Sequence, residues 1–213
     1  MDLYFSPLAC SLASRIALYE ADADADARFI EVDPKTKRTM TGDDYRAIYP
    51  LGLVPLIRFD DGSLLSENAA VLQYVAARYP GADLGGRDDL ERARLQQWLC
   101  FIGTELHKAL FIPLFDQGLS EDAKARARDK SESRFAFLDN HLRGRDFLLD
   151  RFTVADAYLY TVLNWTGSTK VDLTPWPAIA AYHKRMQARP SIAKAFKEEF
   201  ALYQAELARH KAA

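Results

Sequence analysis

Long hydrophobic runs, clustered cysteines and blocks of like charge are all missing from this sequence. No segment approaches the roughly 20 apolar residues of a membrane-spanning helix, and residues 1–5 carry neither a basic flank nor a signal-peptide core. We therefore expect a cytoplasmic protein that is not bound to a membrane. Lys and Arg (28 together) nearly balance Asp and Glu (30) and form no basic stripe, which argues against nucleic acid as a partner.

Cysteine is scarce as well. Cys10 and Cys100 are the two cysteines, and they lie far apart in neither a CxxC motif nor a metal-ligand spacing. We expect no disulfide framework and no metal site. What is present is a chain of 213 residues, 49% of them hydrophobic, which is long enough to bury one large or two modest cores.

The first third of the chain alternates short apolar runs with helical patterns. The periodicity predicts strands at 2–6, 28–33, 55–59 and 64–66, and helices at 11–23, 43–49 and 69–79. Asp60-Asp61-Gly62 joins the last two strands and is typical of a hairpin turn. The order β-α-β-α-β-β-α predicts an α/β domain over residues 1–81.

A stretch with three glycines, at 81–87, is followed by helical patterns alone. The predicted helices span 88–114, 121–142, 154–167, 177–188 and 192–210. We place the domain boundary in this stretch, so that residues 88–213 form an all-α domain. Thr153 and Asp156 have the spacing of a capping box at the start of the third of these helices.

Cys10 lies between the first strand and the first helix, so we expect its sulfur near a helix N-terminus. The positive end of the helix dipole and free backbone N–H groups favour a thiolate there. Ser11 follows directly and could donate a hydrogen bond to a bound sulfur. The alternative interpretation is a small buried cysteine without chemistry.

Two other segments suggest binding of a peptide-like ligand. If the Val54-Pro55 bond is cis, the backbone of Val54 would face an extended peptide. The alternative is a proline that only opens a strand. Glu67 and Asn68 lie where the third helix begins, a position that suits a carboxylate and an ammonium group. The alternative is that Ser66 or Asn68 caps the helix.

The first helix of the second domain contains a polar group of residues. Thr104, His107 and Lys108 are three and four residues apart and would share one face. Glu105 would point elsewhere, towards a partner subunit. The alternative is an ordinary solvated helix face.

Together these motifs resemble the cytosolic glutathione transferases, and the Ala-Cys-Ser start with the segment 98–108 is similar to the bacterial beta class. The resemblance extends over nearly the whole chain. It implies a thioredoxin-like domain at 1–81 that binds glutathione, and a helical domain at 88–213 that forms a hydrophobic second-substrate site. It also implies a homodimer, with glutathione as co-substrate and no other cofactor.

The resemblance assigns roles to individual residues. Pro55 would be the cis proline, Val54 would bond the cysteinyl backbone of glutathione, and Lys35 would reach its glycyl carboxylate. The implied catalytic residues are Cys10, Ser11 and His107. The implied glutathione-binding residues are Ala9, Lys35, Leu53, Val54, Pro55, Glu67, Asn68, Thr104, Glu105 and Lys108. Three residues depart from the class, with Phe5 in place of Tyr, Leu8 in place of Gly and Cys100 in place of Asn.

The first functional hypothesis is conjugation, in which the glutathione thiolate attacks a small hydrophobic electrophile. A second is thiol transfer, in which Cys10 forms a mixed disulfide with glutathione that a second glutathione releases. Isomerase or dehalogenase reactions that use glutathione are also compatible with the sequence. A hypothesis of another class is a binding protein that keeps the fold without turnover.

Overall fold

The computed structural model of the protein describes residues 1–212, which form two compact units. The first unit combines Met1–Ala82 with the chain from Pro190 onward, and the second comprises Asp83–Arg189. An α/β unit and an all-helical unit are therefore present, as predicted. The last helix, α10 (Pro190–Ala212), differs from the expected domain division. The sequence places it in the helical domain at 88–213, whereas its packing on the first unit assigns it there.

A four-stranded mixed sheet lies at the centre of the first unit, in the order β2-β1-β3-β4. β1 (Asp2–Phe5) pairs in parallel with β2 (Arg28–Glu31) and antiparallel with β3 (Leu56–Arg58). β4 (Leu64–Ser66) pairs antiparallel with β3, so the predicted hairpin is confirmed. The predicted strands end within two residues of these bounds.

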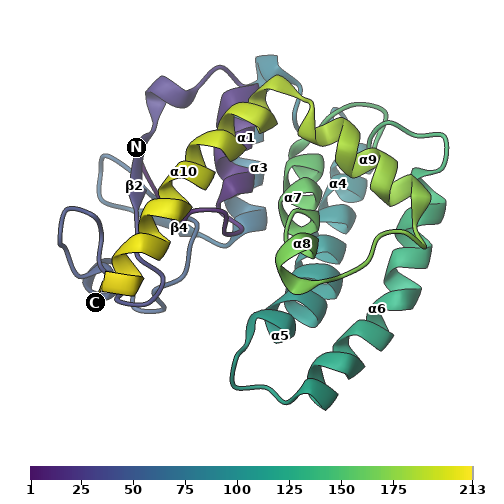
Figure 1. Cartoon of the computed structure of the whole chain (residues 1–213). Coiled ribbons are helices and arrows are strands. Elements are labelled where there is room, and N and C mark those ends of the chain that lie inside the picture. The colour runs from purple at the N-terminus through teal and green to yellow at the C-terminus, as the bar shows by residue number, and fades with distance from the viewer. Residues whose placement is uncertain (213) are drawn as a thin grey trace. The chain divides into compact units, whose positions relative to one another are not determined.

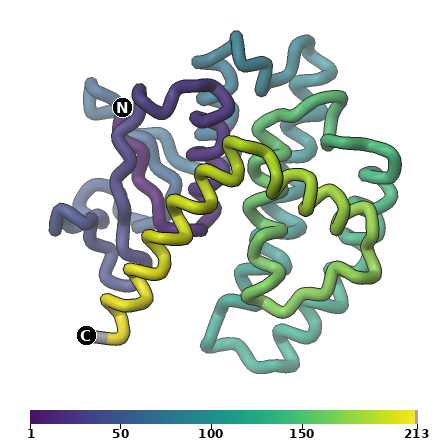
Figure 2. Tube along the Cα trace, turned by 45° about the horizontal axis from the view of Figure 1, so that its top comes forward, coloured from purple at the N-terminus to yellow at the C-terminus, as the bar shows by residue number. Residues whose placement is uncertain are grey.

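Helices pack along the sheet of this unit. Figures 1 and 2 show α10 running beside α1 (Leu12–Glu20), and α1 also packs against α3 (Asn68–Arg78). Ile16 of α1 and Ile192 of α10 have no exposed surface. The shorter elements are α2 (Tyr45–Ile48) and the two 3-10 turns η1 (Asp24–Asp26) and η2 (Pro80–Ala82).

The second unit contains helices only. One helical stretch comprises α4 (Asp89–Phe101), η3 (Ile102–Phe111) and α5 (Ile112–Phe115). The sequence predicts a single α-helix at 88–114, but the middle of the stretch, η3, is π-helical. The remaining helices are α6 (Glu121–Leu142), α7 (Val154–Leu163), α8 (Thr166–Thr169) and α9 (Pro177–Gln187). The helix predicted at 154–167 is therefore divided into α7 and α8.

Helix α7 is the core helix of the second unit, because all ten of its residues are buried. Its start has the capping box that the sequence predicts. The Oδ2 atom of Asp156 accepts hydrogen bonds from the backbone N–H (2.9 Å) and the hydroxyl (3.1 Å) of Thr153. The box fixes the point where the chain enters the core.

The stretch Asp89–Phe115 is long and apolar enough to count as a candidate membrane span by length and composition. Core helices of water-soluble proteins meet the same criterion, so it is weak evidence of a span. The apolar side chains of Leu95, Leu99, Leu106 and Leu110 are buried inside the second unit. In the 18-residue window that meets the criterion, 39% of the residues are buried.

Candidate functional site

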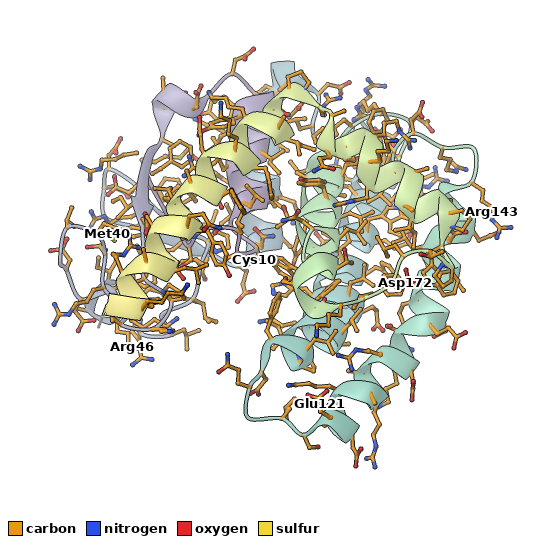
Figure 3. All side chains as sticks on the ribbon, viewed as in Figure 1. Cys10, Met40, Arg46, Glu121, Arg143 and Asp172 are labelled. Carbon is orange, nitrogen blue, oxygen red and sulfur yellow. The ribbon has the colours of Figure 1, made fainter. Side chains whose placement is uncertain are left out.

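Cys10 lies in the turn between β1 and α1, where Figure 3 labels it. The turn is closed by backbone hydrogen bonds from Ala9 N to Ser6 O (3.1 Å) and from Ala13 N to Cys10 O (3.2 Å). The cysteine is half-buried, and its Sγ donates a hydrogen bond to the carbonyl oxygen of Val54 at 3.2 Å. Two residues that the sequence analysis singled out separately are thus in direct contact.

Ser11 does not face the same way as Cys10. It has no exposed surface, and its Oγ donates to Ser6 O (3.2 Å) and accepts from Ser6 N (3.2 Å). The hydroxyl proton that was expected to reach a bound sulfur is therefore already used inside the protein. Ser11 ties the end of β1 to the start of α1, and the structure does not support a catalytic role for it.

The backbone ahead of Cys10 is held by a residue from the far end of the chain. Leu8 has a φ of 58°, and its N–H donates to Oε2 of Glu199 on α10 at 2.8 Å. Glu199 has no exposed surface and also pairs with Arg15 through Oε1 at 2.8 Å. The position of Leu8 favours glycine, because side chains rarely adopt a positive φ.

The bond between Val54 and Pro55 is cis, as the resemblance implies. Val54 is half-buried, while the preceding Leu53 is largely exposed. The carbonyl of Leu53 accepts a hydrogen bond from the hydroxyl of buried Tyr45 at 2.7 Å. Leu53 thus presents its side chain to solvent while its carbonyl anchors the loop.

The start of α3 has an exposed acidic residue and a buried amide. Glu67 is exposed, occupies the N-cap position and has a φ of 69°. Asn68 is the first residue of the helix, and its Oδ1 accepts from Ser14 Oγ at 3.3 Å. Its Nδ2 is buried and has no hydrogen-bond partner among the described residues. The side chain of Glu67 makes no hydrogen bond that caps the helix.

Lys35 is exposed in the loop that follows β2. Its backbone N–H donates to Oδ1 of Asp33 at 2.9 Å, and the N–H of Thr36 donates to the same oxygen at 2.8 Å. Asp33 therefore shapes the segment that carries the lysine. The side chain of Lys35 lies in solvent, where a carboxylate of a ligand has access to it.

In the second unit, His107 lies on the buried side of η3 rather than on a solvated face. Its Nδ1 is 2.7 Å from the hydroxyl of Tyr158, and its ring packs edge-on against Trp165. Burial, together with the nearby charge of Lys108, lowers the pKa of His107 to about 4. The imidazole is therefore neutral at pH 7, with one nitrogen that donates a hydrogen bond and one that accepts.

The residues around His107 do not share one face as the α-helical spacing predicted. Thr104 and Lys108 are exposed, whereas His107 is buried, because the π-helical turn of η3 shifts residues relative to an α-helix. The Thr104 hydroxyl donates to Cys100 O (2.9 Å). Glu105 accepts a hydrogen bond from Arg134 Nε of the same chain (2.8 Å). The sequence analysis expected it to point towards a partner subunit and did not predict this pair.

Glu199 and Arg15 were missed by the sequence analysis. A signal existed, because the buried face of α10 continues through Ile192 and Ala195 to Glu199, which places a carboxylate where an apolar residue is expected. The described residues contain no group of three or more His, Cys, Asp or Glu arranged to hold a metal ion.

Two family models match the chain. That of the glutathione S-transferase N-terminal domain matches residues 9–78, and that of the C-terminal domain matches residues 98–190. The glutathione S-transferase GstA of Escherichia coli O157:H7 is 39% identical over 201 residues, which cover 93% of this chain and 98% of that protein.

Solved structures are equally similar. A sphingomonad glutathione S-transferase complexed with glutathione is 40% identical with a TM-score of 0.87, over 93% of this chain and 98% of that chain. The bacterial beta class glutathione S-transferase of Sphingomonas chungbukensis is 41% identical, with the same TM-score and the same shares of the two chains. The fold, the cysteine turn and these relatives agree, and the chain belongs to the glutathione S-transferase family, with the bacterial beta class among its structural neighbours.

Proposed function

We propose that this glutathione transferase joins the thiol of glutathione to small hydrophobic electrophiles, and that glutathione binds on the first unit around Cys10. The observation that carries the proposal is the contact between Cys10 Sγ and Val54 O at 3.2 Å, in the turn directly ahead of α1. A partly exposed cysteine that lies beside a helix start and contacts the backbone ahead of a strand suits a thiol ligand with a peptide backbone. A relative of 40% identity is complexed with glutathione, which supports the same ligand here.

Each part of glutathione has a complementary group in the first unit. Val54 would pair with the cysteinyl backbone, while Ala9 and Leu53 flank it. The exposed carboxylate of Glu67 would bind the γ-glutamyl ammonium group, and the first N–H groups of α3, beginning at Asn68, would bind its carboxylate. Lys35 would bind the glycyl carboxylate. In the reaction a carbon–sulfur bond forms and the leaving group, such as chloride, departs with the electron pair.

The second unit would supply the apolar substrate surface. We propose that neutral His107 and exposed Lys108 belong to the second-substrate site, with His107 held in place by Tyr158. Thr104 retains hydroxyl lone pairs for a polar contact while it donates to Cys100 O. We further propose a cytoplasmic homodimer, in accordance with the family; sedimentation equilibrium on the purified protein tests the dimer.

The test is glutathione-dependent conjugation of chlorodinitrobenzene by the wild type and by Cys10→Ala. Cys100→Ala is the matched control, because Cys100 is exposed on α4 in the other unit. We expect turnover by the wild type and the control, and a changed pH dependence for Cys10→Ala. No turnover by the wild type would exclude conjugation of this substrate class.

Thiol transfer is the second candidate, because Cys10 is a free cysteine that is not fully buried. In that reaction the Cys10 thiolate attacks oxidised glutathione, a mixed disulfide forms and one glutathione leaves. Intact-mass measurement after treatment with oxidised glutathione would then show one adduct that is absent from Cys10→Ser. An adduct without chlorodinitrobenzene turnover would favour thiol transfer over conjugation.

A further inference from the structure

The last turn of α10 lies beside the loop that follows β2 in the first unit, where Figures 1 and 2 show the C-terminal end of the helix. His210 Nε2 is 2.7 Å from Oδ2 of Asp33, and the two side chains are only 13% and 11% exposed. Arg209 forms an ion pair with Oε1 of Glu31 at 2.6 Å. The end of the helix is thus fixed to the end of β2 at two points.

Asp33 connects His210 with the loop backbone. Its Oδ2 faces His210, while its Oδ1 accepts from the N–H groups of Lys35 and Thr36. Burial by itself would raise the pKa of Asp33, but the hydrogen bonds from Thr36, His210 and Lys35 outweigh it and lower the pKa to about 2. The carboxylate is therefore charged over the physiological range and accepts all three donors at once.

Backbone hydrogen bonds from Lys37 N to Asp33 O (3.0 Å) and from Asp33 N to Arg38 O (2.9 Å) close the loop, and the carboxylate of Asp33 holds the two amides inside it. Pro34, Lys35 and Thr36 are exposed, and the next residue, Lys37, has a φ of 56°. An exposed segment of this kind loses conformational entropy when a ligand immobilises it, and contacts that order it beforehand reduce that cost. Asp33 provides two such contacts, and His210 is a further donor to its carboxylate.

We propose that His210 is a positioning residue for glutathione: by fixing Asp33 it orders the backbone at Lys35 and raises the affinity for the glycyl carboxylate of the ligand. The inference rests on the proposed function, which has Lys35 bind that carboxylate. His210 itself does not contact the ligand in this proposal. The C-terminal turn of α10 thereby becomes part of the glutathione site although it lies about 175 residues from Lys35 in the sequence.

The binding test is titration calorimetry of the full-length protein with glutathione and with glutathione ethyl ester, whose glycyl carboxylate is neutralised. We expect His210→Ala to weaken glutathione binding about fivefold and to leave binding of the ester unchanged. His210→Gln retains an N–H donor and should recover most of the loss. Lys211→Ala is the control on the same turn, because Lys211 is exposed.

Arg209→Ala separates positioning of the loop from simple anchoring of the helix. It removes the ion pair with Glu31 but leaves the contact of His210 with Asp33. Hydrogen exchange should therefore accelerate at the Lys35 and Thr36 amides in His210→Ala more than in Arg209→Ala. This readout requires no ligand, so it also decides the claim about loop order if the wild type fails to bind glutathione and the proposed function is wrong.

Two outcomes would overturn the inference. One is unchanged exchange at Lys35 and Thr36 in His210→Ala. The other is an equal loss of affinity for glutathione and its ester, because that would show a general effect on the unit rather than on the glycyl end. In steady-state kinetics the expected pattern is a raised KM for glutathione with kcat retained.

Discussion

Each of the two units contains a carboxylate with no exposed surface, Asp156 in the second unit and Glu199 in the first. Asp156 receives hydrogen bonds from uncharged donors, namely Thr153, the backbone N–H of Leu148 (2.9 Å) and the hydroxyl of Tyr182 (3.0 Å). Glu199 instead pairs with the guanidinium of Arg15 and with the N–H of Leu8.

The two buried carboxylates differ in how far along the chain their partners lie. For both groups burial raises the pKa, that of Asp156 to about 6 and that of Glu199 to about 7. Asp156 begins a helix, and its donors lie within 26 residues of it in the sequence. Glu199 joins segments more than 180 residues apart, so it fixes the cysteine turn to the last helix.

The largest expected effect is that of removing the local cap. Asp156→Ala leaves the N–H groups of Thr153 and Leu148 without their acceptor inside the core, so we expect the free energy of unfolding to fall by about 4 kcal/mol. Urea denaturation at pH 7 measures it. Asp150→Ala, at an exposed position nearby, is the control and should change stability by less than about 0.5 kcal/mol. Equal losses in the two variants would contradict the role of the cap.

Removing Arg15, the cation that pairs with Glu199, should lower the free energy of unfolding slightly less than removing Asp156. Arg15→Met leaves Glu199 buried without its counter-charge, so at pH 9, where Glu199 of the wild type is ionised, we expect a loss of about 3 kcal/mol in unfolding free energy. Adding Glu199→Leu to this variant removes the uncompensated charge and should recover part of the loss. A double variant less stable than Arg15→Met would show that packing rather than charge dominates at this site.

Glu199 should change the pH dependence of the free energy of unfolding in the direction opposite to that of a carboxylate whose pKa is lowered by folding. The pKa of Glu199 is raised in the folded state from near 4.5 to about 7, so its stabilising contribution is present below pH 4.5 and is lost as the pH rises through 7. Relative to Glu199→Gln, the wild type should lose about 2 kcal/mol of unfolding free energy between pH 5 and pH 8. Parallel curves for the two proteins would contradict the shifted pKa.

The smallest expected effect concerns the backbone that Glu199 holds. Leu8 has a φ of 58°, which glycine adopts without the steric cost of a Cβ atom. Leu8→Gly should therefore be more stable than Leu8→Ala by about 1 kcal/mol, since both variants lose the same leucine packing. Thermal unfolding of the pair measures this difference. An equal or lower stability of the glycine variant would show that Leu8 is not strained.

The sequence was most informative for features that depend only on residues close together in the chain. The strand and helix order, the hairpin at Asp60–Gly62 and the box formed by Thr153 and Asp156 each depend on neighbours within a few residues. It was less reliable for side-chain direction. Ser11 turns inward to Ser6, and His107 turns inward to Tyr158, because burial in the folded unit decided which face each residue occupies.

By itself the sequence determined the alternation of strands and helices, the place of Cys10 between β1 and α1, and the family, since each follows from local periodicity and short motifs. Only the tertiary structure decided that α10 belongs with the first unit, and that Glu199 and His210 reach the loops at Leu8 and Asp33. The physical reason is that these residues lie far apart along the chain. Their contacts form only when α10 packs against the rest of the first unit, and no local sequence pattern encodes that packing.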